Sequence, residues 1–366
     1  MAEIERVAVV LFNLGGPDSL DAVEPFLFNL FKDPAIIAAP HPFRWLIAKL
    51  ISRRRAPIAR EIYSHMGGAS PILGETQAQA EALKTALTAQ QGGIQWRVEI
   101  AMRYWHPFAE ETAGRLKTFA AQHIVLLPLY PQFSGTTTGS SIKNWDRAAL
   151  ARGLNANRGL VCCYPDHPAF IAAQLGYIAD AIKTARQDIG GGQPLHILLS
   201  AHGLPKRVIA RGDPYQWQVE RTSAAIAHGL GVRGLVGPET EIVTCYQSRV
   251  GPLEWIGPAT DAEIKRAGAA GAAVVVVPIA FVSEHSETLV ELDIEYAALA
   301  RASGVTSYTR VPALATNDGF IACLTELVMA TLGDVDVPCR VHSGMTGPED
   351  CARAFPTCPR CGYGAA

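Results

Sequence analysis

The most apolar stretch of the chain lies near residue 275, and acidic side chains follow it at regular intervals. Residues 274–281 read VVVVPIAF, the pattern of a parallel strand that is buried on both faces. We expect a helix after this strand, with Ser283 as its N-cap and an acidic residue against its positive end. Four glutamates recur at helical spacing and would share one face of that helix. They are Glu284, Glu287, Glu291 and Glu295.

The acidic row has two interpretations. An acidic helical face is usually a solvated surface, and like charges this close repel one another. Ligands of open parallel sheets, however, bind beyond the carboxyl ends of the strands, which is where this row begins. The position of the row therefore keeps a functional role open for its carboxylates.

Apolar runs of strand length alternate with helical segments along most of the chain. This alternation predicts parallel α/β sheets whose functional loops share one edge. The predicted strands lie at residues 7–13, near Val98, at 123–130, at 196–200, near Thr244 and at 274–281. Residues 151–168 are interpreted as a crossover, after which the pattern restarts.

Three strand-and-loop motifs occur twice in the same order. VVLFN before LGGP is echoed by HILLS before AHGLP, the segment from Met102 to Phe108 by TCYQSRVGPLEW, and IVLLPLYPQFS by VVVVPIAFVSE. Chance matches of short motifs are the alternative, but the shared order favours two similar Rossmann-like lobes that face each other across a cleft. Leu14 and His202 would then occupy equivalent strand ends, so that one side of the cleft is apolar and the other carries a base.

His202 and the acidic row provide groups for acid–base chemistry and metal binding. A single histidine is usually structural, but His202 follows a strand in a Gly-Leu-Pro turn, where its imidazole would project into the cleft. Clustered carboxylates raise one another's pKa, which suits them to carry protons near neutral pH. Histidine and carboxylate can also hold a divalent iron ion briefly. Aromatic side chains on nearby loops would suit a large flat ligand. They are Tyr63, Tyr104, Trp105 and Trp255.

A metal-dependent hydrolase or a two-lobed binding module could use the same groups. A hydrolase would need a denser ligand set such as HxH or HExxH, which the sequence lacks. A binding module of the periplasmic type would carry a signal peptide. The start, MAEIERVAVVLFNLGGP, has acidic residues where such a peptide needs basic ones.

Residues 31–57 combine crowded apolar side chains with a basic end at Arg53, Arg54 and Arg55. A buried helix is one interpretation of this segment. An apolar lip whose basic edge touches an anionic membrane surface is the other. No uncharged run is a convincing membrane span, since the longest, residues 267–283, is interrupted by glycine and proline.

Length and composition narrow the class of protein. With 366 residues, 49% of them hydrophobic, the chain can bury a large core, and two domains are expected. A net charge of -2 gives no electrostatic case for a nucleic-acid partner. We expect a cytoplasmic protein, in which eight cysteines are more often reduced, metal-bound or cluster-bound than paired in disulfides.

A cysteine-rich tail follows the second lobe. Its thiols include a CxxC motif, and thiolates at such spacing can converge on one metal ion or cluster. They belong to Cys339, Cys351, Cys358 and Cys361. A structural zinc and a tail with incidental cysteines are the alternatives. The predicted division of the chain is therefore a first lobe at residues 1–165, a second lobe at 166–335 and a tail at 336–366.

Six motifs together resemble those of the ferrochelatases, over about residues 5–330. They are NLGGP from Asn13, GGASPI from Gly67, RYWHP from Arg103, SAHGLP from Ser200, YQSRVGP from Tyr246 and FVSEHSETLVELDIEY from Phe281. The last three are very specific as a set. The resemblance implies a lyase that inserts Fe²⁺ into protoporphyrin IX, giving protohaem and two protons in the final step of haem synthesis.

The resemblance also implies roles for particular residues. His202 and Glu287 stand where the family has its iron-binding or proton-accepting pair. Glu284, Glu291 and Glu295 match the acidic path that leads away from that pair. Matches to the porphyrin pocket are Leu14, Tyr63, Ser70, Arg103, Tyr104, Trp255 and His285. Residues 31–57 match the membrane-facing lip, which implies peripheral association with the inner face of a membrane.

The tail is similar to that of ferrochelatases with a 2Fe-2S cluster, held by three tail cysteines and one from the body of the chain. The tail ligands would be Cys351, Cys358 and Cys361. Animal members take the body ligand from the loop after Pro-Gln-Phe-Ser, where this chain has Gly135. Cys162 or Cys163 is therefore the first choice, and Cys339 the second. A homodimer formed through the tail is one possible assembly.

Two other functions would use the same fold. One is a chelatase for another tetrapyrrole or metal, such as coproporphyrin III with iron, or sirohydrochlorin with cobalt or nickel. The other is a porphyrin carrier without turnover. The pair of His202 and Glu287 favours an enzyme over a carrier, and the apolar lip favours protoporphyrin over the more highly charged coproporphyrin.

Overall fold

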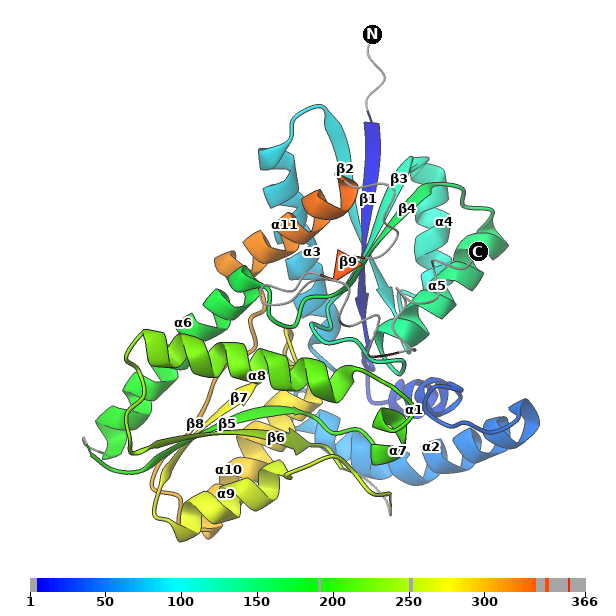
Figure 1. The fold of residues 1–366 in the computed structure, drawn as a ribbon. Coiled ribbons are helices and arrows are strands. Elements are labelled where there is room, and N and C mark those ends of the chain that lie inside the picture. The colour runs from blue at the N-terminus through cyan, green and yellow to red at the C-terminus, as the bar shows by residue number, and fades with distance from the viewer. Residues whose placement is uncertain (1–4, 190–191, 250–252, 334–339, 342–354, 356–366) are drawn as a thin grey trace. The chain divides into compact units, whose positions relative to one another are not determined.

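The computed structural model describes residues 5–189, 192–249, 253–333, 340–341 and 355, and it divides into two compact units (Figure 1). The first unit contains residues 5–163 together with 321–333 and 340–341, and the second contains those between 164 and 320. The first boundary lies close to the predicted one at 165. The second differs from the predicted 335, because the chain returns to the first unit within helix α11 (Asp318–Leu332).

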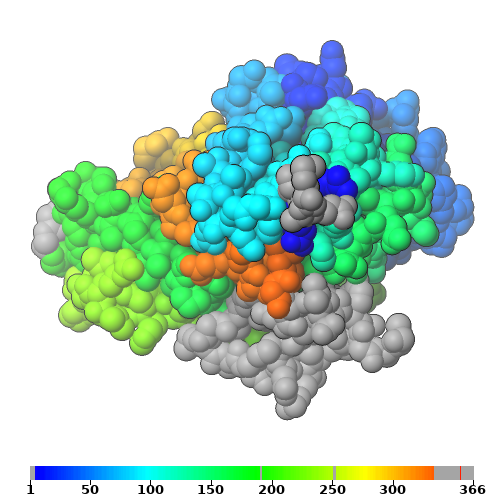
Figure 2. Space-filling view, turned by 90° about the horizontal axis from the view of Figure 1, so that it is seen from above, coloured from blue at the N-terminus to red at the C-terminus, as the bar shows by residue number. Residues whose placement is uncertain are grey.

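Helix α11 belongs with the first unit because its apolar side chains are buried there. Leu324, Leu327 and Val328 have no exposed surface. The helix passes strand β4 (Asn157–Cys163) so closely that a Cβ on Gly159 would lie 2.5 Å from a methyl group of Thr331. Figure 2 shows α11, in orange, beside cyan residues of the first unit. The boundary near residue 320 therefore marks the return of the chain to its first unit, not the start of a separate tail.

The first unit is built on a parallel sheet with the strand order β2-β1-β3-β4-β9. Besides β4, its strands are β1 (Glu5–Asn13), β2 (Ile94–Met102), β3 (His123–Pro128) and β9 (Arg340–Val341). The central strand β1 is buried from Val7 to Phe12, as expected for a parallel strand covered on both faces. The interpretation of residues 151–168 as a crossover was wrong, because β4 lies within them. Its four buried residues were too short an apolar run to stand out.

Helices cover the sheet of the first unit. They are α1 (Val23–Phe31), α2 (His41–Ser64), α3 (Ile72–Gln90), α4 (Ala109–Phe119) and α5 (Thr138–Arg152), with α11. Helix α5 ends where Gly153 takes a left-handed conformation, with φ of 60°, which glycine adopts without steric cost.

The second unit repeats this architecture with a parallel sheet of order β6-β5-β7-β8. Its strands are β5 (Leu195–His202), β6 (Thr240–Gln247), β7 (Ala273–Pro278) and β8 (Tyr308–Arg310). Its helices are α6 (Pro168–Ile189), α7 (Lys206–Ile209), α8 (Tyr215–Val232), α9 (Thr260–Ala269), η1 (Glu287–Tyr296) and α10 (Ala297–Ala302). Apolar side chains of β7, η1 and α9 form one core, which includes Val276, Leu292 and Ile264.

The two sheets confirm the repeat predicted from the sequence. The order β2-β1-β3-β4 corresponds strand for strand to β6-β5-β7-β8. Backbone hydrogen bonds beyond the strands also correspond. The amide of Met102 donates to the carbonyl of Pro107 at 2.8 Å, and that of Tyr246 donates to the carbonyl of Pro258 at 2.9 Å. Both units are therefore Rossmann-like sheets flanked by helices, as predicted.

The helix after β7 starts later than predicted and has a wider turn. Residues 287–296 form the π-helix η1, and Ser286 precedes it, so Ser283 is not the N-cap. Glu284 lies in the loop before the helix. The spacing of 4 between acidic residues fits an α-helix and a π-helix almost equally well, so the sequence pattern could not tell them apart. π-Helices are rare and are often found at functional sites.

Helix α2 presents apolar side chains to solvent. Phe43, Leu46 and Leu50 are 64%, 62% and 68% exposed, so this part of the chain is not a buried helix. Lys49 lies among them on the same helix, and its ammonium lies 5.8 Å from the ring centre of Phe28. Among the described helices, none combines the length and apolar character needed to cross a membrane.

Candidate active site

The imidazole of His202 and the carboxylate of Glu287 form a hydrogen-bonded pair in the second unit. His202 is the last residue of β5 and Glu287 the first of η1, and Nδ1 of the histidine lies 2.7 Å from Oε2 of the glutamate. The side chains are 36% and 25% exposed. The structure therefore brings these two residues into contact, as predicted. Solvent can still reach the pair.

The two members of the pair shift each other's pKa. Burial opposes a charge on His202, but the adjacent Glu287 carboxylate outweighs burial, and the pKa of the imidazole is raised. Burial likewise opposes the charge on Glu287, and the facing His202 outweighs it, lowering the pKa of the carboxyl to about 2. An imidazole whose proton is stabilised by a carboxylate is a better base than an isolated one. The pair is thus suited to accept a proton from a ligand.

A second histidine in the same region has its pKa shifted in the opposite direction. His285 is buried, its ring packs against Phe281 with 4.6 Å between ring centres, and its Nδ1 lies 3.2 Å from the carbonyl of Ser283. Burial lowers the pKa of His285, although the nearby carboxylates of Glu287 and Glu284 oppose the change. The two histidines therefore have pKa values shifted in opposite directions.

Glu291 lies one turn further along η1 and is held by two residues that sequence reasoning missed. Ser248 donates to it from its amide at 2.8 Å, and Gln247 donates from Nε2 at 3.0 Å. The hydroxyl of Tyr296 adds a third donor at 3.0 Å. Burial raises the pKa of Glu291, the Glu287 carboxylate raises it further, and these donors only partly offset the rise.

The other two glutamates of the predicted row lie elsewhere. Glu284 forms an ion pair with Arg310 at 2.8 Å and accepts a hydrogen bond from the amide of Ala313 at 2.9 Å. Arg310 lowers the pKa of Glu284 despite burial. Glu295 is exposed at the end of η1. Only Glu287 and Glu291 of the row converge with His202.

In the first unit, five predicted pocket residues gather beyond the carboxyl ends of β1 and β2. They are Leu14, Tyr63, Ser70, Arg103 and Tyr104. The rings of Tyr63 and Tyr104 share one apolar cluster, against which Leu14 packs. The amide of Tyr104 donates to the carbonyl of Leu14 at 3.0 Å, and that of Ser70 to the carbonyl of Pro17 at 2.8 Å. The predicted set is therefore brought together within this unit.

Asp33 organises this set and was missed from the sequence. Its Oδ2 accepts hydrogen bonds from Arg103 at 2.7 Å, from the hydroxyl of Tyr104 at 2.8 Å and from the hydroxyl of Ser140 at 2.5 Å. The carboxylate is 2% exposed and the guanidinium 14%. Much of the hydrogen-bonding capacity of Arg103 is thus used inside the protein.

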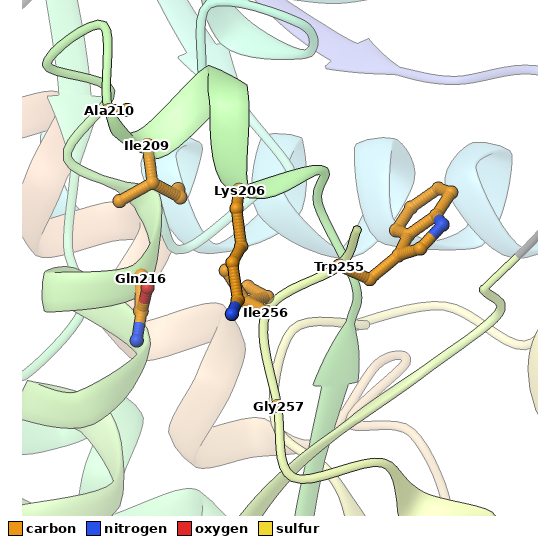
Figure 3. Close-up of a pocket in the computed structure, with 7 residues that line it drawn as sticks. All are labelled: Lys206, Ile209, Ala210, Gln216, Trp255, Ile256 and Gly257. Atoms are coloured by element: carbon orange, nitrogen blue, oxygen red, sulfur yellow. The ribbon is translucent and has the colours of Figure 1, made fainter. Parts of the chain in front are cut away.

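Trp255 lies beside the end of strand β5. A Cβ on Gly203 would lie 3.4 Å from its ring, so the indole packs against the residue that follows His202. A hollow of about 600 Å³ lies next to Trp255. Its lining residues are Lys206, Ile209, Ala210, Gln216, Trp255, Ile256 and Gly257 (Figure 3). The indole ring is directed away from Lys206 and Gln216, as Figure 3 shows. Trp255 therefore packs against the strand end and also lines one side of the hollow.

The predicted cluster ligands are only partly within the described structure. Cys351, Cys358 and Cys361 lie outside the described residues, as does Cys339. Cys162 and Cys163 are fully buried in β4. Cys163 pairs directly with Val341 of β9, so the chain enters the tail beside these two thiols. Within the described part of the chain, no three histidine, cysteine or acidic residues are grouped so that they could hold a metal ion.

Similarity to known proteins extends over both units. A model of the ferrochelatase family matches residues 6–332. A ferrochelatase from Hyphomonas neptunium is 51% identical over 330 residues, covering 90% of this chain and 88% of that protein. One from Phenylobacterium zucineum is 50% identical over 353 residues, covering 96% of this chain and 97% of that protein. The solved structure of SirB from Bacillus subtilis with Fe³⁺ has a TM-score of 0.47 and 12% identity, covering 90% of this chain and 96% of that chain.

Proposed function

The chain belongs to the ferrochelatase family, and we propose that it carries out the last step of haem synthesis at the pair formed by His202 and Glu287. The reaction replaces two pyrrole protons of protoporphyrin IX with one Fe²⁺ and releases both protons. The single observation that carries this assignment of the site is the 2.7 Å contact between the imidazole and the carboxylate. Iron enters as a substrate.

His202 is the group that takes a pyrrole proton in this proposal. Its Nδ1 is occupied by Glu287, whereas its Nε2 has no hydrogen-bond partner among the described residues. The Glu287 carboxylate stabilises the imidazolium that forms, which is the arrangement general-base catalysis requires. Burial lowers the pKa of His285, so His202 is the stronger base of the two histidines.

The test is replacement of His202 by alanine. We expect loss of iron insertion into protoporphyrin, while quenching of porphyrin fluorescence still reports binding. His228→Ala is the matched control, because His228 is an exposed histidine of α8 in the same unit. Retained turnover in His202→Ala would remove this histidine from the mechanism.

The acceptor we propose is protoporphyrin IX, taken up at a membrane surface through α2. Phe43, Leu46 and Leu50 are exposed on this helix, and it also carries Lys49 and Arg53. Apolar side chains rimmed by cations favour peripheral binding to anionic lipid. A protein bound there would collect an acceptor of low solubility in water. Location at the inner face of a membrane is part of this proposal.

Vesicle sedimentation would test the membrane contact. We expect binding to vesicles that contain phosphatidylglycerol and weaker binding to pure phosphatidylcholine. Leu50→Ser should reduce binding, whereas Leu150→Ser should not, because Leu150 is even more exposed than Leu50 but lies on α5. Equal binding of both variants would contradict the assignment. Insertion rates with protoporphyrin and coproporphyrin would test the acceptor separately.

A 2Fe-2S cluster in the tail is the second part of the proposal. The entry of the chain into the tail beside Cys162 supports it, since a buried thiol there can serve as the ligand from the body. Visible absorption of the purified protein, with iron and sulfide analysis, is the measurement. Cys162→Ser should lose the absorption, and Cys245→Ser, a buried thiol in β6, should keep it. Colourless protein with one zinc per chain would rule the cluster out.

A further inference from the structure

The hydroxyl of Ser248 lies between two carboxylates that would otherwise not be connected. Its Oγ is 2.9 Å from Oε2 of Glu287 and 2.5 Å from Oε2 of Glu291. Glu287 is already bonded to His202 on the same oxygen. A continuous series of hydrogen-bond distances therefore runs from the imidazole through Glu287 and Ser248 to Glu291.

The number of hydrogens available limits the protonation states that this arrangement allows. A serine hydroxyl has one hydrogen to donate and can accept a second one. It cannot donate to both carboxylates at once, so two ionised groups would leave one short oxygen–oxygen contact without a hydrogen. The geometry is satisfied when one carboxyl group donates to Oγ and Oγ donates to the other. This is the arrangement of a hydroxyl that passes a proton.

The backbone of Ser248 is held in an unusual conformation that serves this contact. Its φ is 61°, in the left-handed region that residues other than glycine seldom adopt. In this conformation the amide of Ser248 also donates to Glu291, at 2.8 Å. Gln247 fixes the same turn, donating from Nε2 to the carbonyl of Glu287 and to Oε2 of Glu291, each at 3.0 Å. Strain of this kind persists only where several contacts enforce it.

We propose that the Ser248 hydroxyl relays the substrate's proton from Glu287 to Glu291, an inference that rests on the proposed function of the His202–Glu287 pair. His202, which has taken the substrate's proton on Nε2, gives its Nδ1 hydrogen to the Glu287 carboxylate, and Glu287 gives a hydrogen to Oγ of Ser248. The O–H bond of Ser248 breaks as its own hydrogen passes to the Glu291 carboxylate. Serine ends with one hydrogen, as it began, and the proton has moved one carboxylate away from the pair. Glu287 is then an ionised carboxylate again, and His202 is a neutral imidazole.

Two substitutions separate the hydroxyl from the backbone. Ser248→Gly removes the hydroxyl but suits a φ of 61°, whereas Ser248→Ala removes the hydroxyl and keeps the strained conformation. If the hydroxyl relays protons, both variants should lose about 10–100-fold in kcat for iron insertion, within the range of positioned proton transfer. The KM for porphyrin should stay within twofold of the wild type. The solvent deuterium isotope effect on kcat should rise in Ser248→Gly, because proton release becomes limiting.

The outcomes discriminate between the relay and a structural role. A kcat within twofold of the wild type in Ser248→Gly would overturn the relay, whatever Ser248→Ala does. A loss of kcat without a rise in the isotope effect would also overturn it and assign Ser248 to support of the backbone. Glu291→Gln should reproduce the loss seen in Ser248→Gly. Failure of the unaltered protein to insert iron into any porphyrin would instead refute the proposed function.

Discussion

Replacement of Asp33 should destabilise the first unit more than any nearby surface change. One oxygen of Asp33 accepts hydrogen bonds from Arg103, Tyr104 and Ser140, and the other accepts one from the amide of Ala35 at 2.9 Å. These partners come from three separate places in the chain. Asp33→Ala would leave a guanidinium that is 14% exposed without its counter-ion and two hydroxyl groups without their acceptor.

The contacts give the size of the expected effect. Breaking one side of a buried ion pair costs about 3–5 kcal/mol. Each neutral hydrogen bond contributes about 1 kcal/mol, but all three side-chain donors share one oxygen, so their contributions overlap. We therefore expect Asp33→Ala to lower the free energy of unfolding by about 4 kcal/mol. Asp33→Asn keeps the shape and one acceptor, and should cost about half as much.

Guanidinium unfolding followed by circular dichroism would measure these differences, with Asp18→Ala, an exposed aspartate, as the control. Because the chain has two units, hydrogen exchange of peptides that contain Arg103 would show whether the loss is local to the first unit. Porphyrin affinity should fall in parallel, since Arg103 and Tyr104 lose their support. A loss below 1 kcal/mol in Asp33→Ala would refute the view that this carboxylate organises the set.

Three further predictions concern the second unit. Glu287→Gln removes the charge that raises the pKa of His202, so NMR should show the histidine titrating at lower pH than in the wild type. The pair stabilises the fold fully between about pH 4.5 and 6.5. This stabilisation is lost above that window as His202 deprotonates and below it as Glu287 protonates. The melting temperatures of the wild type and Glu287→Gln should therefore differ most within the window. Gly203→Ala would place a Cβ 2.9 Å from the Gln247 carbonyl and should cost about 1–3 kcal/mol; an unchanged melting temperature would contradict this. Glu284→Gln should lower stability through its arginine partner while kcat stays within twofold, and a tenfold loss of kcat would return Glu284 to the proton path.

The sequence predicted the two sheets because both signals it carries for them are local. Apolar runs mark the central strands β1, β5 and β7, and the recurrence of motifs beside them predicted two similar lobes, which the shared strand order confirms. Strand β4 was missed because its polar start hides a short buried end. The π-helix was missed because a spacing of 4 between glutamates does not distinguish it from an α-helix.

The site was predicted as far as residue type and position at a strand end allow. His202 and Glu287 stand out because His202 ends β5 and Glu287 comes after β7, and the carboxyl ends of these two strands lie at one edge of the sheet. Ser248, Gln247 and Asp33 do not stand out, because single polar residues of these types occur at many other positions in the chain. Their roles depend on contacts with residues about 40 to 107 positions away, and no local pattern records those distances.

The return of the chain to the first unit has a consequence for biosynthesis. Residues 164–320 can fold as soon as they leave the ribosome, because all four strands of their sheet lie within them. The unit that is translated first is completed later, because helix α11, which packs against β4, is synthesised after the strands of the second unit. The amino-terminal half therefore leaves the ribosome with part of its core open, and the nascent chain matures in the reverse order of its synthesis.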